Sequence, residues 1–217
     1  MRLPPAVRDH SKIVFYGGST FLVEADVYEP AEDTYLMANN LNVRQGEQVL
    51  ELGTGSGLLA ILAAKIGADV IATDINPAAL VCARKNASTH KVGNKIDFRS
   101  GDLFDPVVGE RFDMVIFNPP YLPIEKEEVI EGQIDRAWDG GPDGRRIIDR
   151  FLSGISDHLK SKGRAMFLQS SLSDISKTLD ILKARCFQVK IEREKIPFEE
   201  LFLVNMKCGE NADTPEK

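Results

Sequence analysis

Asn118 is the residue in this sequence whose surroundings most clearly suggest chemistry. It ends an apolar run, 114–117, and is followed at once by Pro119, Pro120 and Tyr121. Proline fixes its own φ angle and restricts the residue before it, so the Asn118 side chain would be held in place at a strand end. The carbonyl groups of the Asn118 side chain and the Pro119 main chain could accept hydrogen bonds from a flat NH2 group, and Tyr121 could stack on that group. Prolines can also simply end a strand, but the four residues together are a specific signal.

A glycine-rich stretch, ELGTGSG at 51–57, offers a second site for a ligand. Glycines let the backbone turn tightly and let a ligand approach the main chain. The dinucleotide pattern G-x-G-x-x-G, counted from Gly53 and Gly55, would need a third glycine where the chain has Leu58. Glu51 would also repel a pyrophosphate, whereas it could accept a hydrogen bond from a cationic or hydroxylated ligand. S-adenosylmethionine (SAM), which carries two cationic groups and no phosphate, therefore fits better than NAD, and the alternative is a tight turn beside a solvated Glu51.

Two further acids follow the next expected strands. Asp74 ends the second strand, where a carboxylate can bind both hydroxyl groups of an adenosine ribose, a requirement that NAD and SAM share. Asp102 follows the third strand, where it could accept a hydrogen bond from an adenine amino group while Leu103 packs on the ring. An isolated Asp102 would read as a turn residue, but three acids at one rim favour an adenosine site.

The elements that would position these residues alternate along the chain. Strands are expected at 48–52, 69–74, 95–100, 112–117, 164–169, 187–192 and 201–206, and helices at 30–41, 58–66, 76–90, 144–159 and 174–185. This alternation predicts an α/β fold with a doubly wound, mostly parallel sheet and helices on both faces. Ligands bind at the carboxyl ends of the strands in such sheets, so the glycine stretch, the acids and Asn118 should share one rim.

Composition limits the other classes of protein. The 217 residues, 43% of them hydrophobic, suit a single domain over 1–208, with 1–25 poorly assigned and a disordered tail at 209–217. The formal net charge of −6 argues against a protein that binds nucleic-acid phosphates. The three cysteines and three histidines have no ligand spacing, so no metal is expected. There is no signal peptide and no apolar run near the ~20 residues of a membrane span, so a cytoplasmic protein is expected.

A SAM site beside Asn118 would suit methyl transfer to a planar nitrogen. The lone pair of such a nitrogen is delocalised, so it attacks poorly. Two carbonyl groups that accept hydrogen bonds from its N–H groups would favour a more pyramidal, more nucleophilic nitrogen and would aim it in line with a sulfonium methyl group. No strong general base is needed, because the proton leaves easily after methylation.

Four motifs, in this order, resemble those of the HemK-type protein-glutamine methyltransferases: DVYEPAEDTYLM (26–37), TDINPAAL (73–80), FNPPYLP (117–123) and AWDGGPDGRRIIDRF (137–151). The resemblance spans about residues 26–206 and is greatest to the eukaryotic and archaeal branch, which lacks the helical N-terminal domain of the bacterial branch. It implies a Rossmann-like class I methyltransferase with seven strands, the last antiparallel. It also implies that the enzyme makes N5-methylglutamine in the Gly-Gly-Gln loop of a class 1 translation release factor.

The same resemblance implies roles for individual residues and a partner. The resemblance adds Thr34 to the residues that would contact SAM. The full set is Thr34, Glu51, Gly53, Gly55, Asp74, Asp102, Leu103 and Asn118. The glutamine amide would contact Asn118, Pro119, Pro120 and Tyr121. A small zinc-binding activator subunit would add to the edge at the third strand, where Ile96 and Phe98 are candidate contacts. The charged loop at 124–135, over the acceptor channel, has no assigned role.

Other functions remain open. An N6-adenine methyltransferase would use the same motif on a planar NH2 group, but it would need base flipping and a basic track, which the negative charge disfavours. A small-molecule methyltransferase and a binding module without activity are the remaining alternatives.

Overall fold

The computed structural model describes residues 11–124 and 138–209. The tail at 210–217, most of the charged loop at 124–135 and the first ten residues lie outside this range. Among the described residues, no helix is both long and apolar enough to cross a membrane.

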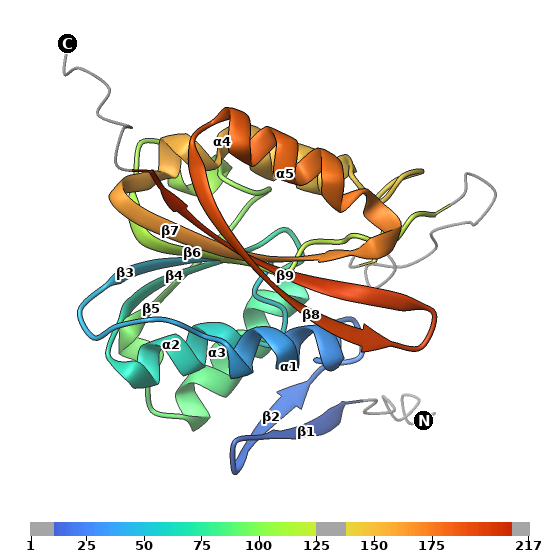
Figure 1. Cartoon of the computed structure of the whole chain (residues 1–217). Helices are drawn as coiled ribbons and strands as arrows, with labels where there is room; N and C mark the ends of the chain where they lie inside the picture. The colour runs from blue at the N-terminus through green and yellow to red at the C-terminus, as the bar shows by residue number, and fades with distance from the viewer. Residues whose placement is uncertain (1–10, 125–137, 210–217) are drawn as a thin grey trace, which may run out of the picture.

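A seven-stranded sheet forms the centre of the molecule (Figure 1). Its strands are β3 (Gln48–Leu52), β4 (Asp69–Asp74), β5 (Ile96–Ser100), β6 (Phe112–Phe117), β7 (Leu159–Ser170), β8 (Phe187–Ile196) and β9 (Glu199–Cys208). The spatial order is β5-β4-β3-β6-β7-β9-β8, in which β9 runs antiparallel to both β7 and β8, whereas the pairs from β5 to β7 are parallel. The predicted doubly wound sheet with an antiparallel last strand is confirmed. The chain order reverses between β3 and β6, which puts the ends of these two strands side by side.

Helices cover both faces of the sheet, as Figure 1 shows. On one face lie α1 (Glu32–Asn39), α2 (Leu58–Ile66) and α3 (Pro77–Thr89); on the other lie α4 (Arg146–Gly154) and α5 (Ile175–Ala184). The central strands serve both layers, because successive side chains point to opposite faces. Thus Met114 and Ile116 pack in the first layer, whereas Val115 and Phe117 pack in the second.

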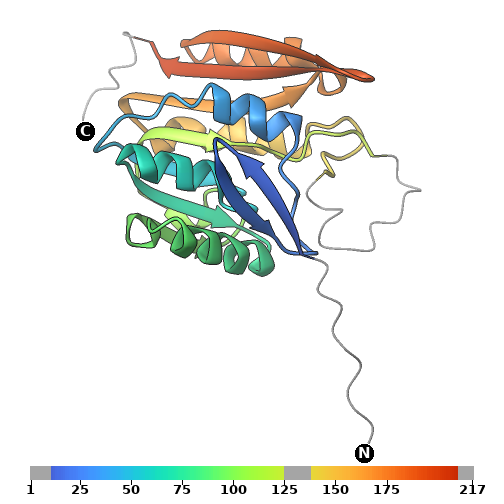
Figure 2. The ribbon, with the colours of Figure 1, turned by 90° about the horizontal axis from the view of Figure 1, so that it is seen from below.

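The N-terminal segment, which the sequence pattern assigns poorly, forms a hairpin of β1 (Lys12–Tyr16) and β2 (Ser19–Val23). Gly17 and Gly18 make its turn with positive φ angles of 55° and 74°. Figure 2 shows the hairpin crossing the helical layer beside the sheet. Asn86 of α3 is buried and fixes it, since its side chain bonds to both the N–H and the carbonyl of Leu22.

The predicted elements at the C-terminal half differ from the structure in length. The Pro-containing link expected after residue 192 is a tight turn at Pro197–Phe198, because β8 and β9 extend to form one long hairpin. The helix expected at 144–159 ends as an α-helix at Gly154 and continues as a 3-10 turn, Ile155–His158.

β5 is an edge strand, as predicted, but its apolar side chains do not face outward. Ile96 and Phe98 are only 6% and 7% exposed and belong to the core beneath the helices. These two side chains therefore offer an activator subunit little surface, and their contact with one stays a prediction. The reason is geometric: the free edge of a strand presents main-chain N–H and C=O groups, whereas side chains project above and below the sheet.

Candidate active site

A cavity of about 640 Å³ lies at the carboxyl ends of the central strands. All the residues that the sequence assigned to a site line it: Thr34, Glu51, Gly53, Gly55, Asp74, Asp102, Leu103, Asn118, Pro119, Pro120 and Tyr121. They come from five separate parts of the chain, and the sheet brings them together.

The three glycines after Glu51 serve different purposes. Gly53 and Gly55 have φ angles of 64° and 55°, which side chains disfavour, and a Cβ at Gly55 would meet no atom within 4 Å. The main chain at Gly55 therefore borders open space that a ligand can approach. A Cβ at Gly57 would instead lie 2.9 Å from the Cβ of Ala83, so this glycine lets α2 pack closely on α3.

Glu51 is buried, so the alternative of a solvated Glu51 is wrong: the residue is 3% exposed. Its Oε2 atom accepts hydrogen bonds from the Thr54 hydroxyl at 2.5 Å and from the Ala60 N–H at 3.1 Å. Burial nevertheless raises the pKa of Glu51 to about 8. A cation placed beside it would favour the charged form.

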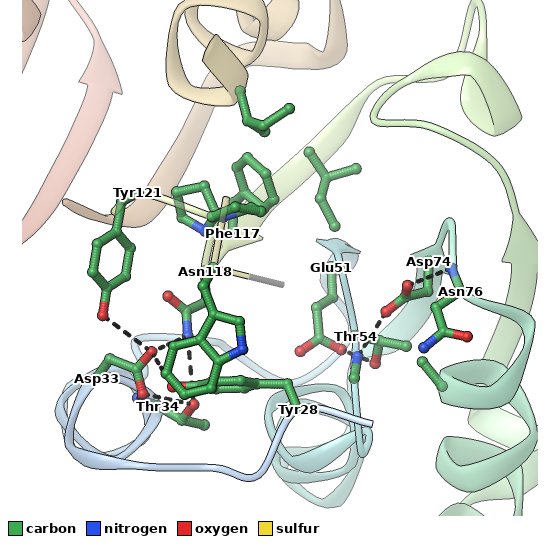
Figure 3. A pocket seen from close by; sticks show the side chains of 18 of the residues that line it. Tyr28, Asp33, Thr34, Glu51, Thr54, Asp74, Asn76, Phe117, Asn118 and Tyr121 are labelled. Atoms are coloured by element: carbon green, nitrogen blue, oxygen red, sulfur yellow. Dashed lines mark hydrogen bonds between the residues drawn. The ribbon is translucent and has the colours of Figure 1, made fainter. Parts of the chain in front are cut away.

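Asp74 holds the glycine loop as well as lining the cavity (Figure 3). Its carboxylate accepts hydrogen bonds from the Gly55 N–H at 2.9 Å and the Asn76 N–H at 2.8 Å, and burial raises its pKa. Asp102, in contrast, is half-exposed and forms a salt bridge of 2.8 Å with Arg150. An adenine amino group at Asp102 would have to share its carboxylate with this arginine.

Asn118 lies directly after β6, and its side chain points to Asp33 of α1 in the wall of the cavity, as Figure 3 shows. Its Nδ2 atom donates to the Asp33 carboxylate at 2.8 Å and lies 3.4 Å from the Thr34 hydroxyl. Its Oδ1 atom is buried and has no hydrogen-bond partner in the described parts of the chain. A buried acceptor without a partner is costly, so this atom is suited to receive a donor from a ligand.

Two tyrosines complete the wall around Asn118. Tyr28 and Tyr121 both donate hydrogen bonds to Asp33, at 2.7 Å and 3.4 Å. Burial and the neighbouring carboxylate raise the pKa of both phenols, so they stay neutral donors at physiological pH. The Trp138 ring meets Tyr28 edge-on, with centroids 5.2 Å apart. This aromatic wall suits a flat polar group.

The motif at 137–151 supports the loop that carries Tyr121. Leu122 donates to Trp138 and accepts from Gly140 through the main chain, at 3.1 Å and 2.9 Å. Gly144 passes so close that a Cβ would collide with the main-chain oxygen of Tyr121. This stretch therefore fixes the position of the residues that follow Asn118.

The sequence did not single out Asp33, Tyr28 or Trp138. Each lies within or beside a motif that was recognised, but their mutual contacts join residues far apart in the chain. The one local signal is Asp33 itself, a charged residue on the buried side of α1, next to Thr34.

The cavity fits SAM in its chemistry. Buried and half-buried carboxylates at Glu51, Asp74 and Asp102 suit a cationic ligand with hydroxyl groups and disfavour a phosphate. The open space beside Gly55 gives access to the main chain. No group of three or more His, Cys, Asp or Glu side chains in the described residues could hold a metal ion.

Comparisons with known proteins agree with this site. Residues 27–137 match the family model described as the methyltransferase small domain. A Methanocaldococcus jannaschii protein assigned as a protein N5-glutamine methyltransferase is 43% identical over 195 residues, which cover 89% of this chain and 98% of that protein. The Homo sapiens methyltransferase HEMK2 is 36% identical over 175 residues, covering 76% and 81%. The solved Mtq2–Trm112 complex of E. cuniculi, described as responsible for methylating the translation termination factor eRF1, gives 27% identity and a TM-score of 0.67, covering 85% of this chain and 99% of that one.

Proposed function

This chain belongs to the HemK-type branch of the methyltransferase small domain family, and we propose that it transfers a methyl group from SAM to the side-chain amide nitrogen of a protein glutamine. The observation that carries this proposal is the Oδ1 atom of Asn118, a buried acceptor without a partner that lies in the wall of a large acidic cavity. A primary amide offers the N–H donor that this atom lacks.

The cofactor would occupy the side of the cavity formed by the glycine loop and the acids. Thr34, Glu51, Asp74, Asp102 and Leu103 would hold it, together with main-chain atoms at Gly53 and Gly55, and Asn118 would face its reactive end. SAM, when bound there, supplies an electrophilic methyl group. The amide nitrogen would be gripped by Asn118 and the Pro119 carbonyl, while Pro120 and Tyr121 would form the surface against which the flat group packs.

The contribution of these residues to catalysis is orientation. The Asn118 oxygen would fix one N–H of the amide and so limit how its nitrogen points, and the aromatic wall would border the flat group on the other side. No side chain needs to remove a proton before transfer. The raised pKa values of Tyr28 and Tyr121 agree with this, since neither phenol is a base near neutral pH.

The substrate that best fits is the Gly-Gly-Gln loop of a class 1 translation release factor. The names of the relatives support a glutamine in a protein, and the E. cuniculi complex methylates a termination factor. A loop with two glycines before its glutamine can approach a recessed acceptor closely, because it carries no side chains there.

A partner subunit at the β5 edge is part of the proposal. Within the described residues β5 pairs only with β4, so its outer main-chain groups are available for another strand. The related Mtq2 was solved together with Trm112. A small zinc-binding activator would thus attach through the β5 backbone, with the buried Ile96 and Phe98 left in the core. The described residues of both halves of the chain share one sheet, which supports a single catalytic domain over 1–208.

The test is mass spectrometry of a release factor and of DNA and RNA incubated with the purified chain, its activator and SAM. We expect a gain of one methyl group on the glutamine. A methyl group found on adenine and not on the glutamine would contradict this proposal and support the N6-adenine alternative.

Asn118→Ala removes the acceptor oxygen. Methyl transfer should fall by about 100-fold or more, as for loss of one preorganised hydrogen-bonding group in other active sites, while the thermal shift caused by SAM persists. Wild-type turnover in this variant would show that the wrong group has been chosen.

A further inference from the structure

We propose that Asp33 is a positioning residue that fixes which end of the Asn118 amide faces the acceptor nitrogen. The proposal rests on the proposed function of Asn118 and adds a requirement to it. An asparagine side chain is nearly symmetrical in shape, yet only its oxygen can accept a hydrogen bond from the NH2 group of a substrate. A site that relies on Asn118 therefore needs something that distinguishes the two ends.

Asp33 has the geometry for this. It lies in the first turn of α1 and is only 4% exposed. Its Oδ2 atom lies 2.8 Å from Nδ2 of Asn118 and 2.7 Å from the Tyr28 hydroxyl. Its Oδ1 atom accepts from the N–H of Thr34 at 2.5 Å and from the Thr34 hydroxyl at 3.2 Å. All of the groups around the carboxylate are donors.

A carboxylate can only accept hydrogen bonds, so the end of Asn118 that faces it must be the NH2 end. Turning the amide by 180° would place the Asn118 oxygen against Oδ2 of Asp33, which replaces a charge-assisted hydrogen bond with repulsion. The Asn118 oxygen is thereby directed away from Asp33. This agrees with the observation that the Asn118 oxygen is buried and has no hydrogen-bond partner among the described residues, so that it is left for a substrate.

Asp33 also connects three segments that border the acceptor. The carboxylate joins Tyr28 before α1, Asn118 after β6 and Tyr121 in the loop beyond, as the dashed lines in Figure 3 show. A simpler role would be an acid that stabilises the N-terminus of α1. Glu32, the preceding residue, is exposed and could serve that role, whereas Asp33 points into the protein.

Asp33→Asn is the first variant, because it keeps the shape but lets residue 33 donate as well as accept. We expect kcat to fall by about 100-fold, while the KM for SAM and the SAM-induced thermal shift stay within about threefold of wild type. Glu29→Gln, which removes the charge of an exposed acid shortly before the same helix and outside the set of residues that line the cavity, should keep wild-type kcat. Wild-type kcat in Asp33→Asn would overturn the proposal, even if Asn118→Ala is inactive as the proposed function requires.

An exchange of the two side chains tests the orientation itself. Asn118→Asp alone would put two carboxylates face to face and should inactivate the enzyme. In the double variant D33N/N118D, the amide at 33 can donate to one oxygen of the carboxylate at 118 and leave the other oxygen for the substrate. We expect kcat at least about tenfold above that of Asn118→Asp, a non-additivity that a purely structural Asp33 would not produce. The proposal would be overturned if the double variant has the same melting temperature as Asn118→Asp but recovers no kcat.

Discussion

At the scale of single residues, Glu51 makes the stability of the protein depend on pH. Its folded-state pKa of about 8 lies above the ordinary value of 4.5 because burial disfavours the charged form. A group with a raised folded pKa stabilises the protein fully below the unfolded pKa, and that contribution is lost as the pH rises toward the folded pKa. The ligand-free protein should therefore lose stability between about pH 4.5 and 8.

Glu51→Gln should flatten this part of the stability curve. The full contribution of Glu51 is on the order of 3–5 kcal/mol across the window, from about 1.4 kcal/mol per unit of pKa shift. Urea unfolding at a series of pH values measures it. The slope should decrease without vanishing, because burial also raises the pKa of Asp74. Equal slopes in the two proteins would show that Glu51 is ionised in the folded state.

Below this window the opposite behaviour is expected from three other acids. Hydrogen bonds and salt bridges lower the pKa values of Glu47, Asp113 and Asp149 despite partial burial. Their contribution is present above the ordinary carboxyl pKa and is lost as the pH falls. They serve as an internal control, because Glu51→Gln should leave acid unfolding below about pH 4 unchanged.

The residue types pointed to positions that line one cavity, but they could not predict the contacts among these side chains. The glycines, the acids and Asn118 can be recognised from their residue types and from their positions after predicted strands. Asp33 does not, because its importance comes from contacts with positions 28, 118 and 121, which only the folded chain makes. Likewise, the sequence could not show that Arg150 forms a salt bridge with Asp102, since the two are 48 positions apart.

At the scale of elements, the stretch before α4 acts as a support for the loop after β6. Gly144→Ala should lower both stability and activity, because the added Cβ collides with the Tyr121 oxygen at a φ angle of +70°. We expect a loss of about 2 kcal/mol or more in the free energy of unfolding, with a fall in kcat. Chemical denaturation and single-turnover assays measure the two effects.

Gly109→Ala is the matched control for Gly144→Ala. Gly109 has a similar φ angle of +80°, but its Cβ would meet no atom within 4 Å. It should show the backbone strain alone, about 1 kcal/mol, with unchanged kcat. Equal effects in the two variants would contradict a role for Gly144 in supporting Tyr121.

The β8–β9 turn carries a residue, Phe198, that is unfavourable for stability and that we expect to contact the protein substrate. Phe198 is 100% exposed at a φ angle of +77°, which is unfavourable for both its ring and its backbone, and its neighbours Ile196 and Glu199 line the cavity. Phe198→Gly should stabilise the protein by about 0.5–1 kcal/mol, because no packing is lost. We also expect a higher KM for the protein substrate, with the KM for SAM unchanged. A stable variant with wild-type kinetics would rule out substrate contact at this turn.

At the scale of the whole molecule, Arg145 holds the second helical layer together. It is 2% exposed and donates to the carbonyls of Ser173 and Asp174, to the Thr178 hydroxyl and to Asp149. Arg145→Met should cost about 3–5 kcal/mol, because these acceptors lose their donor, and Arg145→Lys should not restore the forked geometry. Arg193→Met, at an exposed arginine, should cost less than about 1 kcal/mol by thermal unfolding. Similar losses in both would contradict this role.

The overall architecture was predictable because each strand–helix repeat is local. β3, α2, β4 and β6 begin and end where the sequence pattern placed them, since turn residues and caps mark their ends. The β1–β2 hairpin was missed although Gly17 and Gly18 mark its turn. Both of its faces are apolar, with Ile13 and Phe15 exposed and Val14 buried, so it lacks the alternation that reveals a strand.

β9 comes last in the chain but lies between β7 and β8 in the sheet, so we expect β8 to join the sheet only after β9 has been synthesised. β8 leaves the ribosome first, but among the described residues it pairs with β9 alone, and β9 also separates it from β7. A nascent chain that ends before residue 199 has nowhere to dock β8, and it lacks Glu199 and Leu201 from the cavity wall. The pocket is thus completed only when β9 pairs with β7, so an unfinished polypeptide should be unable to capture its small ligand.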